Sequence, residues 1–355
     1  MTTETKSVTV WAPINIALLK YWGKRDHSLM LPLTDSISIT LQSVHGSIGT
    51  TTVLRVRQLE SGNVDQISFT LNGAFHQESI DKTKKVIAGF KIFNGLNDVA
   101  YEIHAESNNN FPTRAGMASS ASGFAALSFG LHHALGLGNR IDQMCITARL
   151  GSGSALRSLY GGFVHWEKGV KADGSDSIAK QWHDETWWPQ LRVLIFIVDA
   201  TEKRVLSRDG MERSRLTSQL FTIRMNEELM AQKVAEFRDA IDRRDFERLA
   251  YLTMKDSNQL HGICMDSYPP NMYHNDTSKE IMYALHRLNE LEGRIVAGYT
   301  FDAGPNAFVL VLDRDVDMLK RYVREMVVNP IKDLIECKVG GGPRLISSST
   351  ITTQQ

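Results

Sequence analysis

The sequence contains few of the features that mark secreted or membrane proteins. Its three cysteines are scattered and odd in number, which argues against a disulfide framework and fits a reducing compartment. The longest strongly apolar run, residues 193–198, is too short to span a bilayer. Residues 1–10 lack the apolar core of a signal peptide. We therefore expect a cytoplasmic protein.

The sequence also lacks an excess of either charge. Lys plus Arg and Asp plus Glu number 40 each, so we expect no nucleic-acid or membrane partner, and any anion site must be local. The 11 histidines show no metal-ligand spacing, because the adjacent His132 and His133 would point about 100° apart on a helix. We therefore predict no metal site built from protein ligands.

A small-residue segment at 111–123 leads into a predicted amphipathic helix. Gly116 allows the backbone to approach a polyanion closely, and the helix N-terminus presents free N–H groups to it. Three hydroxyls can add hydrogen bonds to phosphate or to bound magnesium: those of Ser119, Ser120 and Ser122. Since Ser is a favoured N-cap, an ordinary capped helix start is the alternative. The lysine-bearing phosphate loop G-x-x-x-x-G-K-[ST] is missing, so nucleotide binding would need another design.

A second segment, residues 12–26, combines an apolar run with dense positive charge. Lys20, Lys24 and Arg25 lie within six positions, beside Tyr21 and Trp22. A strand end of this kind suits anions, although three cations alone more often mark a solvated strand end.

These segments resemble known families. The 111–123 segment matches the phosphate loop of the GHMP kinase superfamily in register, at Pro112, Gly116, Ser119, Ser120 and Ala121. Residues 12–26 resemble the signature of the diphosphomevalonate decarboxylases. Residues 149–159 and 299–307 resemble that family's Gly-Ser-Gly-Ser-Ala-x-Arg-Ser motif and its acidic motif. Matching blocks extend from residue 12 to residue 343, so the resemblance covers nearly the whole chain.

The resemblance implies an activity and its ligands. ATP would phosphorylate the 3-hydroxyl of mevalonate 5-diphosphate, and loss of phosphate and carbon dioxide would leave isopentenyl diphosphate, a precursor of isoprenoids and sterols in the mevalonate pathway. ATP is implied as co-substrate, Mg²⁺ as its companion ion, and a homodimer as the assembly. Three alternatives stay open: a mevalonate monophosphate decarboxylase, a mevalonate-type kinase of the same superfamily, and an inactive homologue.

The family motifs imply three catalytic residues. Asp302 would accept the hydroxyl proton, although an Asp also suits the start of the turn that follows. Arg157 would grip the substrate carboxylate through two nitrogens, although a structural ion pair is the alternative. We expect Lys20 to lie near Asp302 and the reacting hydroxyl.

Further residues are assigned to the two ligands. We assign to the substrate Arg157 together with Tyr21, Lys24, Ser154 and Met211. We assign to the ATP phosphates Gly116, Ser119, Ser120, Ser122, Lys203 and Ser207. The chain departs from the family pattern at Arg114, Leu206 and Arg208.

The order of elements predicts an α+β fold. Strands are expected at 8–19, 37–41, 50–56, 67–71, 102–107, 193–198, 294–300, 307–312 and 338–346. Helices are expected at 81–93, 121–135, 141–150, 217–243, 246–254, 278–292 and 316–327. The resemblance implies a two-part GHMP kinase-like fold with the active site in the cleft between an N-terminal half, 1–190, and a C-terminal half, 191–355. The first half would supply the phosphate loop and the second Asp302.

Overall fold

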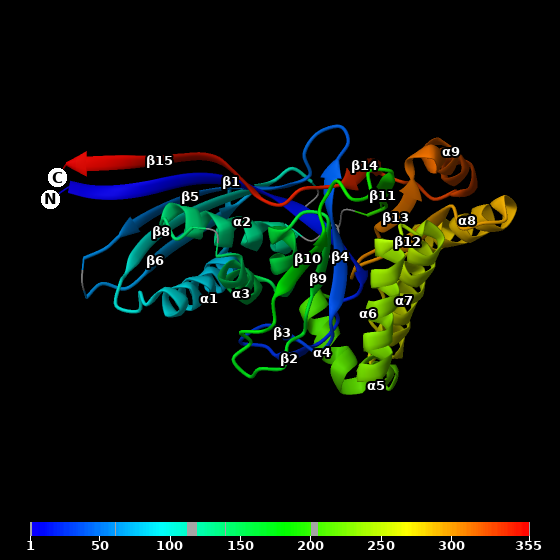
Figure 1. The fold of residues 1–355 in the computed structure, drawn as a ribbon, viewed down its shortest axis with the longest axis horizontal. Helices are drawn as coiled ribbons and strands as arrows, with labels where there is room; N and C mark the ends of the chain where they lie inside the picture. The colour runs from blue at the N-terminus through cyan, green and yellow to red at the C-terminus, as the bar shows by residue number, and fades with distance from the viewer. Residues whose placement is uncertain (1, 61, 112–118, 139, 200–204, 355) are drawn as a thin grey trace.

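The computed structural model describes residues 2–60, 62–111, 119–138, 140–199 and 205–354 (Figure 1). Within these residues thirteen strands join in one sheet, with the path β12-β13-β11-β14-β4-β1-β5-β8-β6-β7. β15 adds to β1, and β9 and β10 add beside β4. The strands of the path are β12 (Ala297–Thr300), β13 (Ala307–Leu312), β11 (Leu191–Ile197), β14 (Asp333–Val339), β4 (Ser36–Ser43), β1 (Thr2–Leu19), β5 (Gly49–Gln58), β8 (Tyr101–Asn109), β6 (Gln66–Leu71) and β7 (Ala74–Phe75).

β1 links the two parts of this sheet. Its first part pairs with β5 and with the C-terminal β15 (Arg344–Gln354), and its second part, from Ile14 onward, pairs with β4. The β1–β4 ladder ends at Leu19, directly before Lys20. Alternate apolar side chains of this second part, Ile14, Ile16 and Leu18, are buried in the core. β1 therefore places the basic segment that begins at Lys20 in the middle of the molecule.

Three helices pack together on one side of the N-terminal strands (Figure 1). They are α1 (Gln77–Asn94), α2 (Ser119–Ala134) and α3 (Ile141–Gly151). α2 lies against β1 and β5, and its Leu127 and Leu131 are buried with Phe90 of α1 and Met144 of α3. This packing holds the N-terminus of α2 as a rigid support next to the central strands.

The C-terminal half places helices against β11, β12 and β13. These are α6 (Glu227–Asp242), α7 (Phe246–Asp266), α8 (Asp276–Glu292) and α9 (Val316–Met326). α7, the longest of them, contacts both β12 and β1, so it touches strands from the two ends of the sequence. Side-chain caps at Asp245 and Asn275 set the starts of α7 and α8.

The α+β class is confirmed, and the differences from prediction are local. The helix predicted over 217–243 is two helices, the short α5 (Leu220–Arg224) and α6, which begins after the N-cap Asn226. The helix before them, α4 (Ser207–Thr217), was not predicted. α7 extends well beyond the predicted 246–254. The pattern also missed the short strands β2 (Lys24–Asp26), β3 (Leu31–Pro32), β9 (Phe163–Trp166) and β10 (Ala179–His183), the 3₁₀ helices η1 (Gly153–Leu159) and η2 (Asp313–Asp315), and most of β15.

The sheet runs without interruption through both predicted halves. β14 and β15 follow residue 190 in the sequence, yet they pair with β4 and β1. The boundary near residue 190 stays a prediction. In the described parts of the chain, we find no helix with the length and apolar character needed to cross a membrane.

Candidate active site

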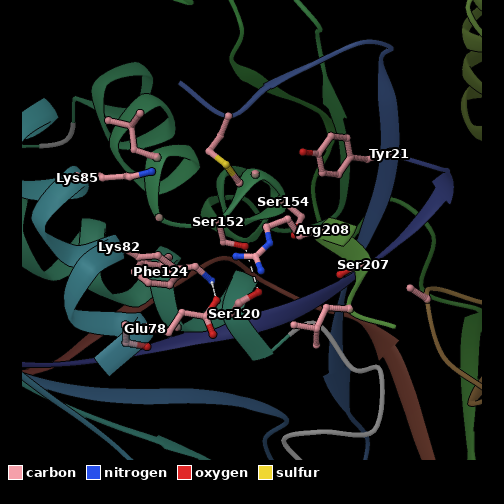
Figure 2. Close-up of a pocket in the computed structure, with 18 of the residues that line it drawn as sticks. Tyr21, Glu78, Lys82, Lys85, Ser120, Phe124, Ser152, Ser154, Ser207 and Arg208 are labelled. Carbon is pink, nitrogen blue, oxygen red and sulfur yellow. Dashed lines mark hydrogen bonds and ion pairs between the residues drawn. The ribbon is translucent and has the colours of Figure 1, made fainter. Parts of the chain in front are cut away.

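A cavity of about 1220 Å³ opens beside the end of β1. Its described lining comes from the segment after β1, from the strands β6, β7 and β8, from the helices α1, α2, α3, η1, α4 and α7, and from the turn after β12. Residues on both sides of position 190 therefore share one wall, as the predicted cleft requires. Figure 2 shows part of this lining.

Lys20 and Asp302, which we call the reactive pair after their predicted roles, meet at this cavity although 282 positions separate them in the sequence. The Lys20 Nζ lies 2.6 Å from Asp302 Oδ1. The Lys20 side chain is 2% exposed and that of Asp302 is 30% exposed, so the carboxylate is the more accessible member of the pair. Burial lowers the pKa of Lys20, and the Asp302 carboxylate opposes that shift.

Arg157 lies in η1 and also lines the cavity. Its Nε donates to Asn15 Oδ1 at 3.1 Å and its Nη1 to Ser36 Oγ at 2.8 Å. Burial lowers the pKa of this guanidinium to about 10, against the opposing effect of Asp302, so it is charged near neutral pH. The two neutral partners hold the group in place without cancelling its charge, which suits a clamp for an anion.

Three of the residues assigned to the substrate line the same cavity, Tyr21, Ser154 and Met211. The Tyr21 ring packs on Trp166 with centroids 4.7 Å apart. A Cβ added at Gly153 would lie 2.8 Å from the Tyr21 hydroxyl, which explains a glycine in this motif. That hydroxyl is buried and has no hydrogen-bond partner among the described residues, so its hydrogen-bonding capacity is unsatisfied.

The serines assigned to phosphate separate into two groups. Ser120 and Ser207 line the cavity, and the Ser120 hydroxyl lies 3.1 Å from that of Ser152 (Figure 2). Ser122 does not lie where the prediction requires: it is fully buried and shares a 2.6 Å hydrogen bond with Thr50 of β5. Two positions along a helix turn the side chain by about 200°, so Ser120 and Ser122 face opposite sides of α2.

Other predicted residues cannot be placed. Gly116, Lys203 and Arg114 lie outside the described residues. Ser119 begins α2, but its side chain is not among those that the structure describes.

The structure reveals four cations that line the cavity together, which we call the cation wall: Lys24, Lys82, Lys85 and Arg208. Burial, together with the charges of the other three cations, lowers the pKa of Lys24 to about 8. Glu78 pairs with Lys82 at 2.8 Å (Figure 2). Of these cations, sequence reasoning missed Lys82 and Lys85, although their i, i+3 spacing on an amphipathic helix was a usable signal.

The two departures from the family pattern at the start of α4, the N-cap Leu206 and Arg208, also line the cavity. Leu206 is partly exposed there, and the Arg208 Nε donates to Asp209 Oδ1 at 3.0 Å. Arg208 therefore adds a positive charge to the wall that Asp209 partly balances.

The cavity provides oxygen donors for a magnesium ion that arrives with phosphate. In the described ranges, no group of three or more His, Cys, Asp or Glu could hold a metal. The Ser120 and Ser152 hydroxyls and the Asp302 carboxylate are hard ligands, of the kind that complete a magnesium shell made mostly of phosphate and water.

The fold and this site define a GHMP kinase-like protein. The family described as diphosphomevalonate decarboxylase-like N-terminal domain matches residues 12–179, and the mevalonate 5-diphosphate decarboxylase C-terminal domain matches residues 193–334. The chain therefore belongs to the diphosphomevalonate decarboxylase family, as its motifs predicted.

Relatives of this chain are named diphosphomevalonate decarboxylase in several organisms. The Rattus norvegicus protein is 42% identical over 330 residues, covering 89% of this chain and 79% of the relative. The Danio rerio protein is 37% identical over 98% of this chain and 95% of its own length. The Candida albicans protein is 39% identical over 97% of this chain and 99% of its own.

Solved structures agree in fold. Mevalonate diphosphate decarboxylase from Trypanosoma brucei superposes with a TM-score of 0.83 at 33% identity, covering 96% of this chain and 98% of that one. A structure described as MDDEF in complex with MVAPP, AMPPCP and magnesium has a TM-score of 0.81 at 32% identity, covering 96% and 99%.

Proposed function

We propose that this chain catalyses the ATP-dependent decarboxylation of mevalonate 5-diphosphate to isopentenyl diphosphate, with release of ADP, phosphate and carbon dioxide. The observation that carries the proposal is the contact of Lys20 with Asp302 at 2.6 Å in a cavity lined with cations. Family membership and the ligands of the related MDDEF structure support the same reaction.

In the first step the substrate 3-hydroxyl attacks the γ-phosphorus of ATP. Asp302 accepts the hydroxyl proton as the new oxygen–phosphorus bond forms and the bond to ADP breaks. Lys20 stays protonated and orients the carboxylate through its 2.6 Å contact. The partial exposure of Asp302 lets it reach a ligand, whereas the ammonium group of Lys20 is buried.

In the second step the 3-phosphate leaves with its bonding electrons, and positive charge develops at carbon 3. The bond to the carboxylate carbon then breaks, carbon dioxide leaves, and the electron pair forms the double bond of the product. Arg157 holds the carboxylate through its guanidinium group, which Asn15 and Ser36 fix in orientation. A carboxylate near carbon 3 stabilises the developing positive charge.

We assign the substrate diphosphate to Lys24, Tyr21 and Ser154, with Met211 packing on the carbon chain. We assign the ATP phosphates to the N-terminus of α2, with Gly116, Ser119 and Ser120, and to Lys203 and Ser207. We assign Ser122 to the support of α2 rather than to a phosphate contact, because its hydroxyl is bonded to Thr50. When bound, Mg²⁺ would neutralise phosphate charge, and the Ser120 and Ser152 hydroxyls would help to hold it.

We further propose that the enzyme works as a cytoplasmic homodimer that supplies isoprenoid and sterol precursors. Its three unpaired, buried cysteines suit a reducing compartment, and the family resemblance suggests the dimer. Sedimentation of the purified protein tests the assembly.

The test is an assay with ATP, Mg²⁺ and, in turn, mevalonate, its monophosphate and its diphosphate. We expect ADP, phosphate and carbon dioxide in equal amounts with the diphosphate alone. Carbon dioxide from the monophosphate would establish the first alternative, and ADP without carbon dioxide would leave only a kinase. No turnover of any ester would indicate an inactive homologue.

A further inference from the structure

α7 contacts the backbone of both segments that carry the reactive pair. The Asp256 carboxylate accepts the backbone N–H of Lys20 at 2.8 Å, and the neighbouring Ser257 hydroxyl accepts that of Phe301 at 3.1 Å. Phe301 directly precedes Asp302. Both helix residues are buried, so two adjacent positions of one rigid element hold two chain segments that are distant in sequence.

Arg224 completes the contacts to Lys20. Its guanidinium group donates to both carboxylate oxygens of Asp256, at 3.1 and 3.2 Å, and also to the backbone carbonyl of Lys20. The backbone N–H and carbonyl of Lys20 therefore both bond to one buried ion pair, formed by Asp256 and Arg224. Because the β1–β4 ladder stops at Leu19, α7 and α5 supply the bonds that a neighbouring strand would otherwise make.

The negative charge of Asp256 is balanced by Lys233 as well as by Arg224. Lys233 places its Nζ 2.8 Å from Asp256 Oδ1. Burial acts to raise the pKa of Asp256, but Arg224 and Lys233 outweigh it and lower the pKa to about 2. The carboxylate is therefore ionised throughout the neutral range.

Burying such a group is not an efficient route to stability. Replacing a buried ion pair by packed apolar residues is often neutral or stabilising. Asp256 and Arg224 instead provide directional hydrogen bonds to the backbone N–H and carbonyl of Lys20. The Lys20 ammonium group must meet Asp302 at 2.6 Å, and a shift of about 1 Å in a reacting geometry can cost about a hundredfold in rate.

We propose that Asp256, with Arg224 and Ser257, positions the reactive pair by fixing the backbones of Lys20 and Phe301. This inference rests on the proposed function. None of the three residues is among the described residues that line the active-site cavity, so they act through Lys20 and Asp302 and not on the ligands.

The test compares Asp256→Asn with Glu236→Gln. The first variant keeps an oxygen for the Lys20 N–H but removes the charge that holds Arg224. The second is a matched control, because Glu236 lines the same small second cavity as Asp256 but pairs with Arg248. For Asp256→Asn we expect kcat to fall about 10- to 100-fold with both KM values within threefold. For Glu236→Gln we expect wild-type kinetics.

A pH profile separates positioning from a general structural defect. The titratable groups that interact electrostatically with Lys20 are Asp302, Asp256, Arg157 and His261. Of these, Asp256 and Asp302 raise the pKa of Lys20. Removing the Asp256 charge should therefore lower the pKa of Lys20. The alkaline limb of the kcat profile, where Lys20 loses its proton, should then move to lower pH. Wild-type kcat overturns the proposal, and so does a lower kcat with an unmoved alkaline limb.

A second variant keeps the test decisive if Asp256→Asn does not fold. Arg224→Lys retains the positive charge but cannot bond both the carboxylate and the Lys20 carbonyl in the same way. It should lower kcat at unchanged KM, and an unchanged kcat overturns the inference. The wild-type assay separates the two proposals: absence of carbon dioxide release by the wild type rejects the function, whereas an active wild type with active variants rejects only the positioning.

Discussion

The reactive pair and the cation wall differ in how their charges are balanced. Lys20 and Asp302 face each other directly, and α7 bonds the surrounding backbone. In the wall, Lys24 is crowded by Lys82, Lys85 and Arg208, and this crowding, added to burial, lowers its pKa. One region is therefore arranged before any ligand arrives, whereas the other carries surplus positive charge.

This difference indicates a division of work within one cavity. Preorganised groups accelerate a reaction because they need no rearrangement as charge develops. Surplus charge attracts and retains a polyanion, at a cost to the protein without ligand. Variants in the reactive pair should therefore change turnover, and variants in the wall should change affinity.

The largest effect is expected for Asp302→Asn. This variant keeps the shape of the side chain but removes the proton acceptor, so turnover should fall by about a thousandfold or more. ATP affinity, measured by calorimetry, should stay within about threefold. Near-normal turnover would remove Asp302 from the mechanism.

Arg157→Lys should lower kcat/KM for mevalonate diphosphate by about a hundredfold. A lysine cannot contact Asn15 and Ser36 and also hold a carboxylate with two parallel bonds. Initial rates of carbon dioxide release measure the effect. Rates equal to those of the wild type would count against the clamp.

The double variant Lys82→Ala/Lys85→Ala tests the cation wall. Loss of two charge-assisted contacts should raise the KM for the anionic ligands about 30-fold and leave kcat nearly unchanged. The control is Lys84→Ala on the same helix, which removes a lysine that is 62% exposed and lies outside the described lining. Equal effects of control and double variant would show that only net charge matters.

The lowered pKa of Lys24 predicts a pH dependence of binding. Since this pKa is about 8 without ligand, Lys24 loses its proton above pH 8 and attracts the diphosphate less. The KM should rise about tenfold between pH 7 and pH 9, and the ligand-free protein should gain stability as pH rises from 8 toward the ordinary lysine value. Lys24→Arg, which does not titrate, should flatten the KM profile. An unchanged slope would assign the titration to another group.

The smallest kinetic effect is expected for Ser122→Ala. Its hydroxyl bonds Thr50 away from the cavity, so KM for ATP should change less than twofold while unfolding free energy falls by about 1 kcal/mol. Ser120→Ala, on the cavity side of the same helix, should show the reverse pattern. Kinetics and urea denaturation of both variants check this pair.

Much of the fold and site could be predicted from the sequence. The sequence patterns of long periodic segments such as α2, α8 and β5 predicted their secondary structure. The motifs identified residues that meet at the cavity. The motifs could not reveal which serine of the phosphate loop faces the ligand, because that depends on how α2 rotates against β5. The break between α5 and α6 was missed because Asn226 sits in a continuous helical pattern.

The positioning network was out of reach for another reason. Asp256 lies among Leu252, Leu260 and Ile263 at helical spacing, so a charge on the apolar stripe of α7 was the available signal. Its partners come from α5 and the end of β1, and no local pattern predicts that these segments meet. Such tertiary contacts follow from the topology of the sheet.

The separation of Lys20 and Asp302 in the sequence also has a consequence for how activity appears during folding. The two residues are 282 positions apart, and bringing together such distant segments is among the slow events of chain assembly. The helices of the N-terminal half can form from nearby segments well before that. Regain of carbon dioxide release after dilution from denaturant should therefore lag behind the recovery of helical circular dichroism.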